Sequence, residues 1–371
     1  MSIDKVQGGY KVRYRTEAGR AGRSRSKKFR LERDAKKFEA DVKSDQGRGL
    51  WVDPSAGRIT LGQYAEQWRL GQVHYSKNTA SLVDNHLRKH ILPFFGDRPI
   101  AGIRSSHLQS WVRDRTQVLA PSTVEAVYGR LVTILRAAVQ ERIIATNPAV
   151  GIKLPKVVNV PVVPLPVVSV TAWAEEMPER DRALIVVGAG LGLRQGEAFG
   201  LTVDRVDFLR RTVRIDQQVI QPDAGPPELT PKLKSDASYR TLPLPVFVAE
   251  ALARHLGQFK PGPFGLIFTD EKGEMLRRKR WNEVLAGAVG RSGIRADATF
   301  HDLRHFYASA LIFAGQSVKV VQARLGHASA METLDTYGHL WPDDEDGTRQ
   351  AIDGVFGRGV ASVWPEADSP G

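Results

Sequence analysis

The sequence predicts an α+β protein that is mainly helical and has three domains. Three observations support this prediction. Most segments repeat apolar residues at helical spacing, short β patterns occur only near the N-terminus and in the C-terminal half, and proline interrupts the chain near its middle. A chain of 371 residues is long enough for two or three domains. Its 42% hydrophobic and 25% charged residues are typical of folded proteins.

Composition excludes several classes of protein. The chain has no cysteine, so it has no disulfide, thiolate metal site or cysteine nucleophile, which fits a reducing cytoplasm. It contains no run of 18 apolar residues and no apolar signal segment at its N-terminus, so we expect no membrane association and no secretion. The 53 Lys and Arg residues exceed the 41 Asp and Glu residues by 12, which favours a polyanionic partner such as nucleic acid.

Residues 1–58 carry 16 Lys or Arg and 8 Asp or Glu, a net charge of +8. Residues 10–15 alternate with period two and predict a strand, residues 17–20 predict a turn, and residues 25–30 predict a second strand with basic side chains on one face. Residues 31–42 have helical apolar spacing. A small basic sheet with one helix suits a DNA groove. The candidate DNA contacts are Arg13, Arg15, Arg23, Arg25, Lys27 and Lys28.

Residues 59–155 predict an all-helical domain. Residues 47–58 before it contain Gly, Pro, Asp and Ser and are typical of a linker. Thr60 is a suitable N-cap for a helix whose apolar stripe ends at Trp68. Three further helical patterns follow, over 77–90, 105–118 and 121–142. Basic side chains lie along these helices.

The C-terminal half predicts a mixed α+β domain over residues 169–345. Four prolines near residues 156–168 predict an extended linker before it, and residues 346–371 form a tail. Strands are expected at 211–219, 234–244 and 266–268. Helices are expected at 179–189, 246–258, 281–291, 302–314, 317–324 and 331–337.

Five short motifs in this domain hold residues that could act together. In order they are Gly-Leu-Arg-Gln-Gly-Glu, Leu-Lys-Ser, His-Asp-Leu-Arg-His, Leu-Gly-His and Thr-Leu-Asp-Thr-Tyr-Gly-His. Each alone has an ordinary structural explanation, such as a surface arginine, a helix cap or a packed tyrosine. The residues of interest are Arg194, Glu197, Lys234, His301, Arg304, His327 and Tyr337.

These residue types suit phosphoryl transfer. A pentavalent phosphate spreads negative charge over its oxygens, and two planar guanidinium groups, Arg194 and Arg304, match that geometry. His301 and Arg304 lie three residues apart on one helical face and can address the same phosphate. A phenol, Tyr337, can form the covalent link that conserves phosphodiester energy. A lysine between two strands, Lys234, can protonate the leaving oxygen.

The ordered motifs resemble those of the tyrosine recombinase family, also called phage integrases. The layout before them, a small basic domain, a helical domain and a proline-rich linker, is also similar, and the resemblance spans about residues 8–345. It is most similar to phage-type integrases with an N-terminal arm-binding domain. The resemblance implies an arm-type DNA-binding domain at 1–58, a core-site-binding (SAM-like) domain at 59–155 and a tyrosine-recombinase catalytic domain at 169–345.

The resemblance also implies roles for the candidate residues. Tyr337 would form a 3′-phosphotyrosine link and free a 5′-hydroxyl, Arg194 and Arg304 would clamp the phosphate, and Lys234 would be the general acid. His301 would assist as acid or base, His327 would bind the phosphate, and Glu197 would support the network. His305 and His339 are interpreted as supporting or structural, and Lys232 as a minor rival to Lys234.

The family further implies the partners of the chain. These are double-stranded DNA attachment sites, three further copies in a homotetramer on DNA, and a host DNA-bending protein and an excisionase as accessory factors. No metal or nucleotide cofactor is expected, because the phosphotyrosine stores the bond energy. The expected reaction is integration or excision of a phage or mobile element, in the cytoplasm at the bacterial nucleoid.

Three alternatives remain open. His301 and His305 have the spacing of a zinc hydrolase helix, although a third ligand is not obvious. A non-catalytic DNA-binding protein would share the fold, but the complete residue set argues against it. A type IB topoisomerase shares phosphotyrosine chemistry, but separate arm and helical domains favour synapsis of two DNA molecules.

Overall fold

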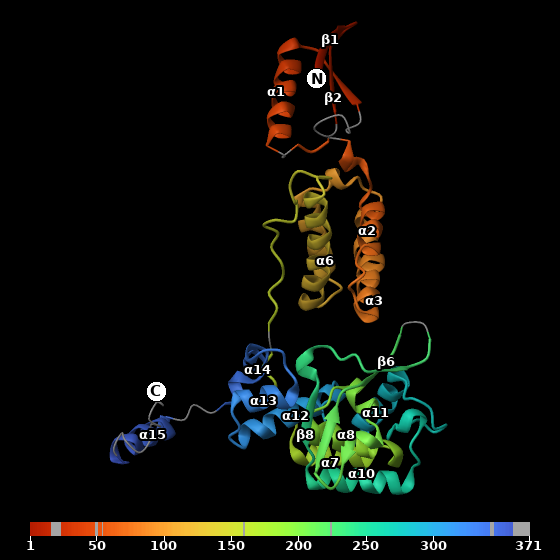
Figure 1. Ribbon diagram of the computed structural model, residues 1–371, viewed down its shortest axis with the longest axis vertical. Helices are drawn as coiled ribbons and strands as arrows, with labels where there is room; N and C mark the ends of the chain where they lie inside the picture. Colours follow the sequence, from red (N-terminus) through yellow and green to blue (C-terminus); the bar gives the residue numbers. More distant parts are fainter. Residues whose placement is uncertain are drawn as a thin grey trace, which may run out of the picture. The chain divides into compact units, whose positions relative to one another are not determined.

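The computed structural model describes residues 1–15, 24–48, 51–53, 55–158, 160–222, 225–341 and 345–358. It confirms the predicted fold class, because helices dominate and the strands form three small sheets. The chain divides into two compact units, Met1–Asn159 and Val160–Gly371, and many of their helices and strands are labelled in Figure 1. No helix within the described ranges is long and apolar enough to cross a membrane.

The chain begins with a three-stranded antiparallel sheet and one helix. Strands β1 (Ser2–Val6), β2 (Gly9–Arg15) and β3 (Ser24–Phe29) pair in chain order, and α1 (Glu32–Gly47) packs against β2 and β3. The sequence did not predict β1. It is held by its register on β2, in which Ile3 faces the buried Val12. The expected turn at residues 17–20 lies outside the described residues, as does Arg23.

The basic side chains of β3 do not share one face, so that prediction is wrong. Residues directly opposite in antiparallel strands point to the same side of a sheet. Lys27 lies opposite the buried Val12 and therefore points to the helix side, where its Nζ lies 4.9 Å from the ring centre of Phe38 on α1. Arg25 lies opposite Tyr14 on the same side. Strand alternation puts Lys28 on the other face.

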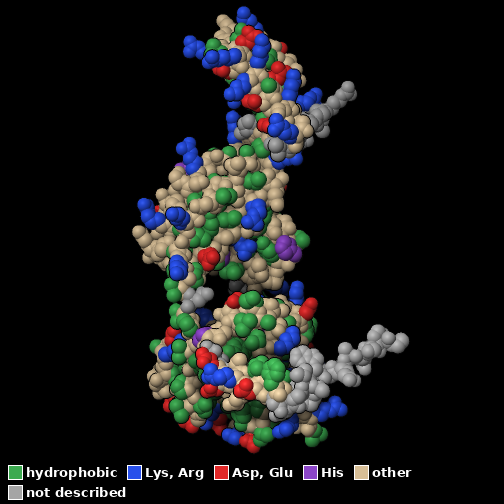
Figure 2. Space-filling model, turned by 90° about the vertical axis from the view of Figure 1, so that its left-hand side faces the viewer, with side chains coloured by type: hydrophobic (Ala, Val, Ile, Leu, Met, Phe, Trp, Pro, Cys, Tyr) green, Lys and Arg blue, Asp and Glu red, His purple; other side chains and the backbone are tan. Residues whose placement is uncertain are grey.

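Trp51, in the segment predicted as a linker, packs with this sheet. Its ring meets Tyr14 and Phe38 edge to face, with ring centres 5.7 and 6.2 Å apart. Three aromatic rings therefore form a small core in a module whose surface carries many Lys and Arg side chains (Figure 2). Sequence periodicity could not find this contact, because Trp51 lies outside any regular element.

The helical region follows the predicted pattern closely. Helices α2 (Leu61–Leu70), α5 (Ser105–Thr116) and α6 (Pro121–Gln140) bury the apolar faces that the sequence indicates. The Thr60 hydroxyl accepts from the Gln63 backbone N–H at 3.2 Å, which confirms the predicted N-cap. Helix α3 (Lys77–His86) is shorter than expected: it continues as a π-helical turn over Leu87–Ile91 and resumes as α4 (Leu92–Phe95).

The second unit contains two small antiparallel sheets. Strands β4 (Val206–Asp207), β5 (Thr212–Ile215) and β8 (Arg240–Pro243) form one, and β6 (Gln218–Ile220) with β7 (Glu228–Thr230) forms the other. The predicted strand at 211–219 is thus two strands. The predicted strand at 234–244 is shorter, because Asp236–Ser238 forms a 3₁₀ turn.

Residues 266–268 were predicted as a strand and are not one. Their side chains are fully buried, which explains the apolar run, but only Leu266 forms an isolated bridge, with Thr202. The Ile267 N–H donates to the Leu201 carbonyl at 2.9 Å, so the segment is tied to the core without a ladder. Three consecutive apolar residues indicate that a segment is buried, but they do not show whether it is a strand, a helix or a loop.

Helices surround these sheets and create one large apolar core. Helix α8 packs against α7, α10 and α12, and α7 also packs against α11. The first helix, α7, begins inside the segment predicted as linker, and α15 lies in the predicted tail. The helices are α7 (Val167–Glu176), α8 (Glu179–Leu191), α9 (Gln195–Phe199), α10 (Val246–Gln258), α11 (Arg278–Ser292), α12 (Phe300–Phe313), α13 (Val318–Leu325), α14 (Ala330–Tyr337) and α15 (Glu345–Arg358).

Candidate active site

Three arginines from three elements converge on the C-terminal end of α13. The last carbonyls of a helix lack intrahelical partners and need other donors. Arg240 Nε donates to the Arg324 carbonyl at 2.9 Å, Arg304 Nη2 to the Leu325 carbonyl at 2.6 Å, and Arg194 Nη2 to the Gly326 carbonyl at 3.2 Å. Consecutive carbonyls of one turn therefore fix the three guanidinium groups side by side.

A single buried carboxylate, Glu197, lies among these arginines. It is 2% exposed and forms ion pairs with Arg194 Nη1 and Arg240 Nη2, both at 2.8 Å. Its second role is local, because it also accepts the Arg194 backbone N–H at 3.0 Å and so caps α9. Burial alone would raise the pKa of Glu197, but Arg240 and Arg194 hold it below its usual value. Glu197 is therefore ionised and fixes the Arg194 side chain.

Arg304 is buried with no carboxylate partner among the described residues. It is 2% exposed, and its guanidinium donates only to the backbone carbonyls of Gly192, at 2.8 Å, and Leu325. Burial and the neighbouring charge of Arg194 lower the pKa of Arg304 to about 10. Three guanidinium groups around one carboxylate leave the site strongly positive, which favours an entering anion.

Two glycines permit this arrangement. Gly192 ends α8 at φ +61°, and a Cβ there would lie 2.3 Å from the Tyr307 ring. Gly326 ends α13 at φ +67°, and a Cβ there would lie 2.8 Å from the Ala237 carbonyl oxygen. Left-handed backbone and close packing both require glycine at these positions. The carbonyls of these same two residues accept from Arg304 and Arg194.

Tyr337 is buried and bonded to a histidine. It is the last residue of α14, is 1% exposed, and its hydroxyl lies 2.8 Å from His305 Nδ1. Burial raises the pKa of Tyr337 to about 12, although the Arg304 charge opposes this. The phenol is therefore protonated near neutral pH, and a base must accept its proton before it can act as a nucleophile.

The other histidines of the candidate set lie on either side. His301 stacks edge to face with His305, with ring centres 4.6 Å apart, and it is exposed at the rim of a cavity. His327 is buried, and its Nδ1 lies 2.9 Å from the Thr333 hydroxyl. Desolvation lowers the pKa of each to about 4, with help from His305 and Arg304 at His301 and from Arg304 at His327. Both are neutral at pH 7.

Lys234 lies between β7 and β8 and lines the same cavity as Arg194 and His301. Its amine is exposed and forms no described hydrogen bond or ion pair. The Lys232 side chain does not line this cavity, and the carbonyl of Lys232 accepts from Gln218 at 2.7 Å. Lys234 is thus the lysine that the fold brings beside the arginines.

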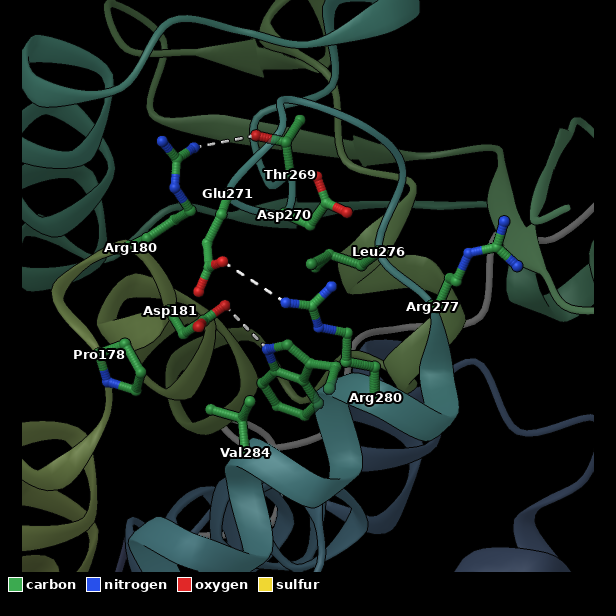
Figure 3. Close-up of a pocket in the computed structure, with 11 residues that line it drawn as sticks. Pro178, Arg180, Asp181, Thr269, Asp270, Glu271, Leu276, Arg277, Arg280 and Val284 are labelled. Carbon is green, nitrogen blue, oxygen red and sulfur yellow. Dashed lines mark hydrogen bonds and ion pairs between the residues drawn. The ribbon is translucent and has the colours of Figure 1, made fainter.

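A second cavity lies against another side of α11 and contains none of the predicted catalytic residues (Figure 3). Its polar groups bind one another: Arg280 pairs with Glu271 at 3.4 Å, and Trp281 Nε1 donates to Asp181 at 2.9 Å. Burial raises the pKa of Asp181. These contacts connect α11 to α8 and to the loop that precedes α11, and we interpret them as structural.

Sequence reasoning missed two residues of this site. Arg240 belongs to no motif singled out above, yet it pairs with Glu197 and caps α13; its place inside a predicted strand was the only signal available. His305 was interpreted as supporting, but it is the histidine within hydrogen-bond distance of the Tyr337 hydroxyl. His339 Nε2 donates to the Val162 carbonyl, 2.9 Å away, and so ties this end of the site to the preceding linker.

Asp302 has a structural explanation. It accepts from the Thr299 N–H at 2.7 Å and forms an ion pair with Arg295, which together cap α12. No cluster of three or more His, Asp or Glu that could hold a metal occurs in the ranges that the structure describes.

Sequence comparisons agree with this geometry. Residues 61–154 match the profile of the phage integrase central domain, and residues 167–343 match that of the phage integrase family. A protein named tyrosine recombinase XerC-like from Caldanaerobacter subterraneus is 27% identical over 86% of this chain and 90% of its own. An integrase of Mycobacterium phage FRAT1 is 24% identical over 80% of this chain and 91% of its own.

Solved structures show the same fold. The Tn1549 transposon integrase in complex with transposon right end DNA matches with a TM-score of 0.69 and 20% identity, over 81% of this chain and 100% of that one. A lambda integrase tetramer bound to a Holliday junction matches with a TM-score of 0.59 and 19% identity, over 89% and 96%. With two adjoining profiles matched and this fold observed, the chain belongs to the phage integrase family of tyrosine recombinases.

Proposed function

We propose that this site performs the reaction of the family, site-specific breakage and rejoining of DNA strands, with Tyr337 as the nucleophile. The observation that carries the proposal is the charge of the site: three guanidinium groups are held at the end of α13 with one carboxylate between them. A phosphodiester entering this site would supply the missing negative charge. Planar donors would then stabilise the additional charge of its transition state.

Each step has a residue to perform it. The Tyr337 oxygen would bond to phosphorus as the bond from phosphorus to the 5′-oxygen breaks, which leaves a 3′-phosphotyrosine and a 5′-hydroxyl. The phenol proton would pass to a neutral histidine, and His305 is within reach at 2.8 Å, with His301 next to it. Lys234 would donate a proton to the leaving oxygen. Arg194, Arg304 and His327 would hold the phosphate.

Burial of Tyr337 implies a movement before cleavage. A phenol that is 1% exposed cannot reach a phosphodiester, so the end of α14 must open to admit the DNA. The hydrogen bond to His305 would break or be replaced in that step.

The N-terminal sheet is proposed to bind DNA with its open face. Strand alternation puts Lys11, Arg13, Arg15 and Lys28 on the face opposite Val12 and Tyr14. Arg13 is paired with Asp4 at 3.1 Å. Arg25 and Lys27 lie on the helix side, so we expect smaller contributions from them than from the open face.

The larger assembly is also a proposal. Family members assemble on DNA, and the matched lambda integrase structure is a tetramer on a Holliday junction. We propose that four copies of this chain join two attachment sites, assisted by a host DNA-bending protein and an excisionase, at the bacterial nucleoid. Assays with one and with two sites distinguish this function from that of a type IB topoisomerase, which would need only one.

The test is to map protein-linked DNA ends. Purified protein is incubated with DNA that flanks its gene, and ends protected by protein are sequenced. We expect staggered ends with protein on the 3′-phosphate and a free 5′-hydroxyl, formed equally well in EDTA. Protein on 5′-ends would contradict the proposal, and loss of cleavage in EDTA that zinc restores would favour the hydrolase alternative.

A further inference from the structure

The cavity beside Arg194 contains residues that the proposed reaction does not use. It has a volume of about 510 Å³ and is lined by the candidate catalytic residues Arg194, Lys234 and His301. Its remaining polar lining comes from Gln195 on α9 and from Arg278 and Asn282 on α11, together with Thr299. A group that fills this cavity would therefore lie next to the scissile phosphate.

Gln195 and Asn282 form a hydrogen-bonded pair of amides that still presents a free acceptor beside free donors. Gln195 Nε2 donates to Asn282 Oδ1 at 2.6 Å, which leaves Gln195 Oε1 as an acceptor and Asn282 Nδ2 as a donor. Exchanging oxygen and nitrogen in both amides again leaves one acceptor and one donor. Side-by-side acceptor and donor groups match the edge of a base, as when an amide binds N6 and N7 of adenine.

The rest of the lining also suits a base. Leu285, Ala298 and Phe300 contribute apolar surface to the cavity wall. An apolar wall favours the face of a base or the methyl group of thymine, whereas it offers nothing to a charged phosphate. Arg278 is exposed and forms no described ion pair, so it remains available for a phosphate at the rim.

We propose that this cavity reads the base pair next to the scissile phosphate, with Gln195 and Asn282 as the residues that contact the base edge. The proposal rests on the proposed function, because Arg194 and His301 would hold the scissile phosphate in the same cavity. Successive base pairs are about 3.4 Å apart along a strand, so the adjacent base is the one within reach. Arg278 contacts the neighbouring phosphate and adds affinity without sequence preference.

The test uses nicked duplexes of the mapped attachment site in four versions, one for each base pair at the position flanking the cut. Covalent capture rates are measured for the full-length protein and for Asn282→Ala, Gln195→Ala and Arg278→Ala. Gln316→Ala is the matched control, because it removes an exposed amide of the same unit whose side chain forms no described hydrogen bond.

We expect the unaltered protein and Gln316→Ala to prefer one base pair by about tenfold or more, the discrimination of one bidentate contact. Asn282→Ala and Gln195→Ala should reduce that preference to about threefold or less, mainly by slowing capture of the preferred version. Arg278→Ala should slow all four versions by a similar factor.

Two results would overturn the inference. One is an unchanged base preference in both amide variants. The other is an equal loss on all four versions, which would make the cavity a phosphate contact only. Neither result would contradict the proposed function. That function would be rejected if the unaltered protein formed no covalent complex with any of the four versions.

Discussion

Arg240 is the residue that most changes our understanding of the site. It donates to the Ser238 and Arg324 carbonyls, both at 2.9 Å, and pairs with Glu197, so one buried side chain joins β8, α9 and the end of α13. Because it does not line the cavity and forms no described hydrogen bond with Tyr337, we consider it a positioning residue. Its effect on the reaction would pass through Glu197 to Arg194.

Arg240→Ala should destabilise the second unit by about 3 kcal/mol or more, because it leaves Glu197 buried with one partner. Arg240→Lys should restore more stability than activity, since an ammonium keeps the charge but cannot bind a carboxylate and two carbonyls in fixed geometry. Urea unfolding and covalent capture rates measure the two effects. Equal recovery of both by lysine would assign Arg240 a purely structural role.

Acid should destabilise the second unit through its buried histidine. Burial, aided by the Arg304 charge, lowers the pKa of His327 from 6.5 to about 4, so between these values the unfolded chain binds a proton that the folded chain does not. The contribution of neutral, buried His327 to the free energy of unfolding is therefore fully present above pH 6.5 and is lost as the pH falls toward 4.

This pH dependence is checked by urea unfolding at pH 7.5 and pH 5.0 for the unaltered protein and for His327→Gln. The variant should lose less stability between the two pH values, although removal of the hydrogen bond to Thr333 lowers its stability at both. His74→Gln, an exposed histidine of the other unit, is the control. An identical loss in His327→Gln would show that His327 does not contribute.

The sequence predicted most of the residues that form the site. Residue types and their order predicted seven site residues, and the structure brings all of them around the end of α13 and one cavity. It could not show that His305, and not His301, meets the Tyr337 hydroxyl, because both lie on one helix and one turn apart. Arg240 was missed because its partners are 43 and 84 residues away along the chain.

The ends of helices α8 and α13 hold the arginine cluster together. Gly192→Ala should destabilise the second unit by about 3 kcal/mol and slow cleavage strongly, because it combines a left-handed backbone penalty with overlap on Tyr307. The carbonyl that binds Arg304 would shift with it. Thermal unfolding and capture rates measure both effects.

Gly293→Ala provides the comparison for Gly192→Ala. Gly293 ends α11 at φ +72°, but a Cβ there would meet nothing within 4 Å. We expect only the backbone penalty of about 1–2 kcal/mol and little change in cleavage. Similar effects of the two variants on cleavage would contradict the importance of the α8 end for the site.

Elements were predicted best where amphipathic spacing is long. Helix α10 has the bounds that the sequence predicts, and α6 begins where it is expected and buries an apolar stripe that runs from Val124 to Ala138. Predictions of short elements were wrong where a buried segment need not be a strand, as at residues 266–268. The prediction that the basic side chains of β3 share one face was wrong for another reason. Neighbouring side chains of a strand point to opposite faces, and a run of basic residues therefore occupies both.

For the whole chain, charge and chemistry lie in different parts. Residues 1–58 hold +8 of the net +12 charge and none of the proposed catalytic residues. Deleting them should lower the salt dependence of DNA binding by about 0.9 in log–log slope for every phosphate that these residues neutralise. Cleavage at core sites should survive, while recombination of full attachment sites should fall sharply.

The deletion is judged by comparing the footprint and recombination yield of the full-length and 59–371 proteins. Replacing Lys11 and Lys28 by alanine should reproduce part of the effect, and Lys27→Ala should do so less, because Lys27 points to the helix side. An unchanged footprint and yield after deletion would reject the arm-binding role and leave the catalytic proposal intact.

The central claim is that the Tyr337 hydroxyl becomes covalently linked to DNA, and covalent capture on a nicked attachment-site duplex tests it most directly. The unaltered protein should form a denaturant-resistant complex, and mass spectrometry should find the nucleotide on the peptide that contains Tyr337. Tyr337→Phe should still bind the DNA but form no complex, because only the hydroxyl is lost. A complex that persists in Tyr337→Phe, with the nucleotide on Tyr307 or Tyr239, would contradict the claim.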